Sequence, residues 1–267
     1  MFDETLEEAW QKRFGVAPSE GFPEIDRFLT HRSVRSYSNK PVPREIALSL
    51  IGAAQSAATS SNLQLWTAIS IQDPEKRREL AHLCADQKQI LDAAWFFCFI
   101  ADLHRLEQVA RDAGEDPDAL DYNEFYMMAV VDAALAAERM VCAAESIGLG
   151  ICYIGALRND PEGVKKALNL PLRTFGVFGL CIGWPADEAR AEIKPRLSPS
   201  SVWHEETYNH EPDTNEYLER MRAFYEEQGM KGSVSWAMRS GRRARTESLT
   251  GRHVLKRFLA DQGLDIR

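Results

Sequence analysis

Cysteine is scarce in this sequence, and its spacing suits none of the sites that cysteines commonly build. Five cysteines are spread over 267 residues in apolar surroundings, with no Cys-x-x-Cys pair and no cysteine–histidine spacing suited to zinc. His204 and His210 are six residues apart rather than the four that would place both on one helix face, so we expect them to be solvated. The pattern predicts buried free thiols in a reducing cytoplasm and no metal site.

Long apolar runs and an excess of positive charge are absent as well. No run reaches the roughly eighteen apolar residues of a membrane span, and the first residues are acidic, unlike a signal peptide. Lysine and arginine number 32 against 40 for aspartate and glutamate, which gives a formal net charge of -8. Because a nucleic-acid partner calls for a basic face, we expect neither a membrane nor a nucleic acid as partner.

The common signatures of nucleotide-binding and hydrolytic sites are missing too. Gly155-Ala156 follows a predicted strand, but the G-x-G-x-x-G pattern of a dinucleotide site and the acidic residue after it are absent. The sequence also lacks a P-loop and a G-x-S-x-G nucleophile motif. The sequence therefore gives no support to these three kinds of site.

The sequence does contain ample apolar material for one large domain. Hydrophobic residues make up 45% and charged residues 27%, as in ordinary globular chains. Apolar runs predict strands over 66–71, 94–101, 151–157 and 174–185, and helical spacing predicts helices over 3–14, 24–30, 44–58, 75–84, 160–168, 214–228 and 252–262. The basic segment 229–251 is expected to be mobile.

The longest predicted helix, 122–147, is rich in alanine and apolar on nearly every side. A helix without a polar face must be buried. We expect it to be both the central core helix and part of a subunit interface.

Two short cationic stretches have the chemistry of a phosphate site. His31-Arg32-Ser33-Val34-Arg35 precedes a predicted helix, and Lys194-Pro195-Arg196 follows the strand 174–185. Arginine binds a phosphate monoester bidentately, and hydroxyl groups can take its remaining lone pairs. Taken alone, either stretch also fits a solvated basic turn.

Two further segments suggest contact with a ligand. Thr59-Ser60-Ser61-Asn62 ends the helix predicted from residue 44 and offers hydroxyl and amide groups to a bound molecule. The glycines of the strand 174–185 indicate close approach to its backbone by a ligand or by another strand.

Taken in chain order, these stretches resemble the FMN-dependent nitroreductase superfamily. The resemblance rests on His31-Arg32-Ser33-x-Arg35, Thr59–Gln64, Gln87-Lys88, Tyr153–Asn159, Phe178–Pro185 and Lys194–Leu197. More narrowly, the sequence resembles the NADPH-dependent, oxygen-insensitive group of major nitroreductases and flavin reductases. The resemblance runs from about residue 24 to the C-terminus, so residues 1–23 are predicted to be an N-terminal extension.

The resemblance implies an α+β fold, with a mostly antiparallel central sheet wrapped by helices. Residues 24–267 would form a single FMN-binding domain, and two copies would form an intertwined homodimer with two FMN sites at the interface. A C-terminal segment from about residue 198 would embrace the partner subunit.

The resemblance also assigns the candidate site residues. His31, Arg32, Ser33 and Arg35, with Lys194 and Arg196, would hold the FMN phosphate, ribityl chain and pyrimidine edge. Thr59, Ser60 and Gln87 would hydrogen-bond ribityl or ring oxygens. Tyr153, Ile154, Gly155 and Ala156 would lie beside the isoalloxazine ring, although the family more commonly has a glycine at the position of Ala156.

NADPH is the implied electron donor, and nitroaromatic compounds and quinones are the implied acceptors. Lys231 and Arg242 of the basic C-terminal segment would meet the 2′-phosphate of NADPH, and Arg252 matches a family arginine near the active site. No catalytic side chain is expected, because the flavin takes hydride and passes it on in a ping-pong sequence.

Three other readings remain open at this point. The protein could be a flavin reductase that supplies reduced FMN to a partner, a flavin-binding protein without turnover, or a superfamily member with different chemistry, such as dehalogenation or flavin destruction. The basic C-terminal segment favours a reduced-nicotinamide donor over the non-catalytic reading.

Overall fold

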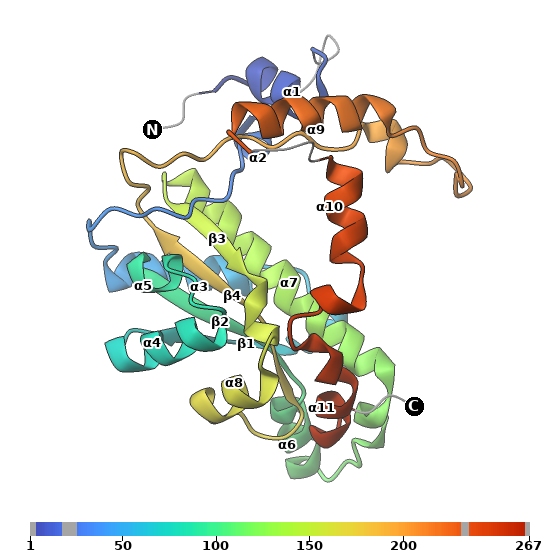
Figure 1. Cartoon of the computed structure of the whole chain (residues 1–267). Helices are drawn as coiled ribbons and strands as arrows, with labels where there is room; N and C mark the ends of the chain where they lie inside the picture. The colour runs from blue at the N-terminus through green and yellow to red at the C-terminus, as the bar shows by residue number, and fades with distance from the viewer. Residues whose placement is uncertain (1–3, 18–25, 231–234, 265–267) are drawn as a thin grey trace. The chain divides into compact units, whose positions relative to one another are not determined.

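The computed structural model describes residues 4–17, 26–230 and 235–264, which belong to two compact units (Figure 1). The smaller unit combines the chain up to Arg32 with residues 191–249. The larger unit combines residues 33–190 with the chain from Thr250 onward. Each unit is described by itself.

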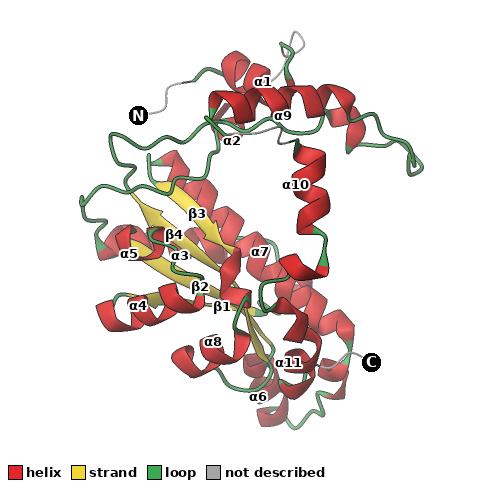
Figure 2. Cartoon of the chain, in the orientation of Figure 1, coloured by secondary structure: helices red, strands yellow, loops and turns green. Residues whose placement is uncertain are grey.

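The larger unit is built on a four-stranded sheet, drawn as yellow arrows in Figure 2. In spatial order its strands are β1 (Trp66–Ile71), β2 (Trp95–Asp102), β4 (Thr174–Gly183) and β3 (Gly150–Ile154). All three pairings are antiparallel, which agrees with the predicted α+β class. β2 is buried along nearly its whole length, and this burial explains its continuous apolar run.

Seven α-helices lie in the described part of this unit. They are α3 (Arg44–Gln55), α4 (Pro74–Leu83), α5 (Gln89–Asp92), α6 (His104–Asp112), α7 (Asn123–Ser146), α8 (Pro161–Leu168) and α11 (Leu255–Asp261). Asp73 and Asp160 cap α4 and α8, where each carboxylate accepts a backbone N–H and a proline opens the first turn.

α7 is the central helix of this unit, as predicted. It packs against all four strands and against α3 (Figure 1). Its buried residues are small for the most part: Ala129, Asp132, Ala133, Ala136, Ala137, Met140, Val141 and Ala144. The alanines let the helix axis come close to the sheet, and the one buried carboxylate among them is the exception to an apolar face.

The close approach expected at the glycines of β4 is made by an aromatic ring in the case of Gly179. A Cβ on Gly179 would lie 2.5 Å from the ring of Phe96, on the neighbouring strand β2. The sequence left open whether a ligand or another strand approaches these glycines. At Gly179 the neighbour is a residue of another strand.

The smaller unit contains α1 (Leu6–Phe14), α2 (Asp26–Leu29), α9 (Asn215–Glu227) and α10 (Trp236–Arg243). A capping box between Thr5 and Glu8 starts α1, and Gly15 ends it in the left-handed conformation with φ 76°. α1 and α9 lie side by side (Figure 1), and a Cβ on Gly15 would lie 2.6 Å from Cδ of Arg220.

Three helices differ from the sequence-based expectation, and one of them is α5, which was not predicted. The segment 229–251, expected to be mobile, contains α10, which Ser235 caps by accepting from the backbone N–H of Met238. α6 was not predicted at all, and none of its residues is fully buried. Among the described residues, no helix combines the length and apolar character needed to cross a membrane.

Candidate functional site

The first cationic stretch continues into an edge of the sheet in the larger unit. The backbone N–H of Val34 donates to the carbonyl of Ile151 at 2.8 Å, and Ser33 forms a parallel bridge with the same residue of β3. A Cβ on Gly150 would lie 2.8 Å from Val34, so the glycine that opens β3 is required by this contact. The structure thus brings Ser33 and Arg35 next to the strand that leads into the predicted flavin segment 153–156.

Arg35 is exposed, and no hydrogen bond or ion pair engages its guanidinium group within the part of the chain that the structure describes. An arginine in this state can bind an anion without first giving up another partner.

Arg32, by contrast, is already paired within the smaller unit. Its side chain is buried, its Nη1 and Nη2 atoms donate to the two carboxylate oxygens of Glu4 at 2.9 and 2.8 Å, and its Nε donates to the Thr30 carbonyl at 3.0 Å. The hydrogen bond from Arg32 is the main cause that lowers the pKa of Glu4 from 4.5 to about 2, and Lys12 acts in the same direction. The charge of Arg32 is therefore balanced by the N-terminal extension.

The second cationic stretch lies in the same unit, with Lys194 and Arg196 exposed on either side of buried Pro195. Arg13, at the end of α1, donates from Nη2 to the His31 carbonyl at 2.7 Å and from Nη1 to the Lys194 carbonyl at 3.3 Å. The two stretches, far apart in sequence, are therefore joined through one side chain. The sequence analysis missed Arg13, since an arginine in the last turn of a helix is ordinary.

A buried carboxylate holds the predicted ribityl-binding loop of the larger unit. Asp132 of α7 accepts from the Thr59 hydroxyl at 2.5 Å, from the backbone N–H of Leu65 at 2.9 Å and from that of Ser60 at 3.3 Å. Thr59 in turn accepts from the backbone N–H of Gln64 at 2.9 Å. The Thr59 hydroxyl thus serves the loop itself, whereas the Ser60 side chain is exposed.

Gln87 lies in the turn between α4 and α5 and is half-buried. Its side-chain nitrogen donates to the Cys84 carbonyl at 3.1 Å, and its side-chain oxygen accepts from Gln89 at 2.7 Å. The turn before it places Ala85 and Asp86 in the left-handed region, with φ of 63° and 54°.

The segment 153–156 is held at both ends by side chains of the same unit. Tyr153 donates its hydroxyl hydrogen to Glu138 at 3.1 Å, and burial, reinforced by that carboxylate, raises the pKa of Tyr153. Arg252 donates from Nη2 to the Gly155 carbonyl at 3.0 Å and from Nε to Asn159 at 2.9 Å. Arg252 is thus brought to the predicted flavin segment, as the resemblance implies.

Two residues predicted to meet NADPH belong to the basic C-terminal segment. Lys231 lies outside the described residues, and Arg242 is exposed on α10. Within residues 4–17, 26–230 and 235–264, no cluster of histidine, cysteine, aspartate and glutamate could hold a metal ion.

Comparison with known proteins identifies the family. Residues 29–184 match the model described as the Nitroreductase family, and residues 194–267 match the model of the Nitroreductase family, C-terminal domain. The chain belongs to the nitroreductase family.

Individual family members are similar over most of their length. An FMN reductase (NADPH) of Bacillus subtilis is 41% identical over 201 residues, which are 75% of this chain and 79% of that protein. An oxygen-insensitive NADPH nitroreductase of Salmonella typhimurium is 40% identical over 70% of this chain and 75% of that protein. The structure of NfrA1 nitroreductase from B. subtilis has a TM-score of 0.82 at 36% identity and covers 90% of this chain and 98% of that one. These matches confirm the predicted nitroreductase fold.

Loss of the Asp132 carboxylate is predicted to destabilise the loop 59–65. Asp132→Ala leaves three donors without their acceptor in a buried place, so we expect the free energy of unfolding to fall by about 2–4 kcal/mol. Asp132→Asn keeps one accepting oxygen and should lose less. Urea unfolding at pH 7 measures both variants, and an Asp132→Ala variant as stable as the unchanged protein would contradict the role given to this carboxylate.

The Glu4–Arg32 pair is predicted to make stability depend on acid pH. Because folding lowers the pKa of Glu4 below its ordinary value of 4.5, its contribution to stability is full above that value and is lost as the pH falls toward about 2. We therefore expect Glu4→Gln to reduce the free energy of unfolding at pH 7 and to reduce it by a smaller amount at about pH 3.5.

Glu7→Gln is the control for this experiment, because Glu7 is an exposed carboxylate in the first turn of α1, three residues after Glu4. A Glu4→Gln effect that stays the same at both pH values, or that Glu7→Gln reproduces, would show that the pair does not act as described.

Proposed function

We propose that the protein is an NADPH-dependent FMN oxidoreductase that reduces nitroaromatic compounds and quinones. The observation that carries this proposal is the 41% identity, over 75% of the chain, to a protein named FMN reductase (NADPH). The similarity to an oxygen-insensitive NADPH nitroreductase supports nitroaromatic compounds as acceptors.

The candidate residues have a donor set that suits FMN. Arg35, Lys194 and Arg196 present exposed cationic side chains, which suit a phosphate group. Ser60 offers an exposed hydroxyl and Gln87 a side-chain amide, which suit ribityl and ring oxygens. The proposed FMN-binding residues are His31, Arg32, Ser33, Arg35, Thr59, Ser60, Gln87, Tyr153, Ile154, Gly155, Ala156, Lys194 and Arg196.

Two of these residues have supporting roles in the proposal. The Arg32 charge is balanced by Glu4, and the Thr59 hydroxyl is bonded to Asp132. Arg32 and Thr59 each hold the backbone of their own loop in place. In this way they position the neighbouring residues that are proposed to bind FMN.

Bound FMN supplies the hydride acceptor and donor, so this chain has to hold and orient its ligands and needs no acid–base pair. Tyr153 stays neutral because burial raises its pKa, and its hydrogen bond to Glu138 fixes one end of the segment 153–156. Arg252 fixes the other end through the Gly155 carbonyl. We further propose Arg252, Lys231 and Arg242 as the residues that meet NADPH.

A second candidate function is an NADPH:flavin reductase, in which free FMN is the acceptor. The activity for which the B. subtilis relative is named, FMN reduction with NADPH, favours it. The two functions differ in the acceptor alone, so a comparison of kcat/KM for free FMN, a nitroaromatic compound and a quinone separates them.

We also propose that the protein acts as a homodimer in the cytoplasm. Met127, Val131 and Leu135 lie four residues apart along α7 and are 55%, 54% and 44% exposed. An exposed apolar row of this kind along a helix suits a subunit interface. The dimer and the location stay predictions.

Steady-state kinetics test the proposed function. If NADPH and the acceptor use one flavin face in turn, initial rates with varied NADPH and several fixed quinone concentrations should give parallel double-reciprocal lines. Intersecting lines would contradict the ping-pong sequence, and absence of NADPH oxidation with all three classes of acceptor would contradict the function itself.

Removal of two proposed phosphate-binding cations tests the site. We expect Arg35→Ala combined with Arg196→Ala to lose bound FMN on gel filtration, because each charge-assisted hydrogen bond contributes about 1.5–3 kcal/mol. Arg78→Ala, which removes an exposed arginine of α4, is the control and should keep its flavin. A double variant that elutes with a full complement of FMN would overturn the assignment.

A further inference from the structure

The helix α1 of the N-terminal extension carries a buried arginine, Arg13, in its last turn. Arg13 is 5% exposed, and its Nε, Nη2 and Nη1 atoms donate to the carbonyls of Leu29, His31 and Lys194 at 2.7, 2.7 and 3.3 Å. Removing a guanidinium group from water is costly unless its N–H groups find acceptors. Arg13 therefore stays buried only while these carbonyls keep their positions.

The three carbonyls lie in or just before the two cationic stretches. His31 is the first residue of one stretch and Leu29 lies shortly before it, and Lys194 is the first residue of the other. A backbone hydrogen bond strengthens this link, since the N–H of Arg196 donates to the carbonyl of Arg13 at 2.8 Å. One residue of α1 thus ties both stretches together within the smaller unit.

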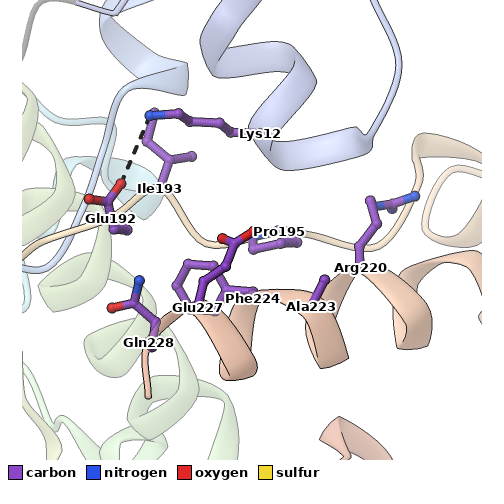
Figure 3. A pocket seen from close by; sticks show the side chains of 9 residues that line it. All are labelled: Lys12, Glu192, Ile193, Pro195, Arg220, Ala223, Phe224, Glu227 and Gln228. Carbon is purple, nitrogen blue, oxygen red and sulfur yellow. Dashed lines mark ion pairs between the residues drawn. The ribbon is translucent and has the colours of Figure 1, made fainter. Parts of the chain in front are cut away.

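Other contacts of α1 and its flanking residues fix the same two stretches. Glu4 holds Arg32 with both carboxylate oxygens, and Lys12 pairs with Glu192 at 3.9 Å (Figure 3). A cavity of about 530 Å³ lies beside this pair. Its wall carries both signs of charge, with Arg220 and Glu227 on α9 (Figure 3). We therefore do not take this cavity as the anion site, and the exposed cations of the two stretches remain the candidates for binding an anion.

We infer that Arg13 is a positioning residue for FMN, which fixes the two cationic stretches in the arrangement that the FMN phosphate requires. The inference rests on the proposed function, in which His31, Lys194 and Arg196 meet that phosphate. Binding is strongest when the donors are already ordered, because ordering a loop on binding reduces affinity.

The fork shape of arginine is essential to this role. A guanidinium group presents five N–H donors in a plane and can reach three carbonyls in different directions. Lysine has one compact ammonium group, so Arg13→Lys keeps the charge but not the full set of bonds.

The test compares two flavins that differ only in the phosphate. Apoprotein is titrated with FMN and with riboflavin, and flavin fluorescence gives each Kd. We expect Arg13→Met to raise the Kd for FMN about tenfold or more and the Kd for riboflavin less than about twofold, since one lost charge-assisted bond corresponds to that factor. Arg222→Met, which removes an exposed cation of α9 in the same unit, should change neither.

Two outcomes would overturn the inference. An Arg13→Met protein with unchanged FMN affinity shows that the two stretches do not depend on this residue. An equal loss of FMN and riboflavin affinity shows that Arg13 supports the fold generally. Should Arg13→Met give no folded apoprotein by circular dichroism, Arg13→Lys decides, with a several-fold loss for FMN alone as the expected result.

Arg196→Ala separates this inference from the proposed function. It should weaken FMN binding and leave riboflavin binding nearly unchanged. If Arg196→Ala keeps the full preference for FMN over riboflavin, the phosphate site itself is misassigned. If Arg196→Ala loses that preference and Arg13→Met keeps it, the site stands and the positioning role falls.

Discussion

Close packing of α7 against all four strands is the contact on which the larger unit depends. Alanines on the buried face make this approach possible. Asp132 sits on that face, so its carboxylate must find donors from the protein. It finds them in Thr59, Ser60 and Leu65. The helix that builds the core therefore also sets the shape of a loop proposed to meet FMN.

Charge plays the corresponding part in the smaller unit. Two stretches rich in lysine, arginine and histidine lie near each other there, and like charges at short range oppose folding. Glu4 balances Arg32, and the buried guanidinium of Arg13 bonds to carbonyls rather than adding an exposed charge. The N-terminal extension thus gives order to a cationic region in which Lys194 and Arg196 are exposed.

Local pattern predicted much of the fold. β1 begins and ends where its alternating residues indicated, and α1 stops at Gly15, whose left-handed conformation was the expected helix end. α6 and α10 were missed because each is rich in polar residues and buries no residue fully.

The site was harder to predict, because its supporting contacts join residues far apart in the chain. Asp132 and Thr59 are separated by 73 positions, and Arg13 and Lys194 by 181. No local pattern carries that information. Thr59 was therefore predicted to bind the ligand, although its hydroxyl group donates a hydrogen bond to Asp132. The assignment of FMN to individual residues came from resemblance to a family, and it stays a prediction.

The most direct test of the central claim is an anaerobic absorbance spectrum of the purified protein, followed through two additions. The account predicts the bands of oxidised flavin, their bleaching by stoichiometric NADPH, and their return when a nitroaromatic compound is added. A protein that stays colourless after incubation with FMN, or a bound flavin that NADPH leaves oxidised, would contradict the account.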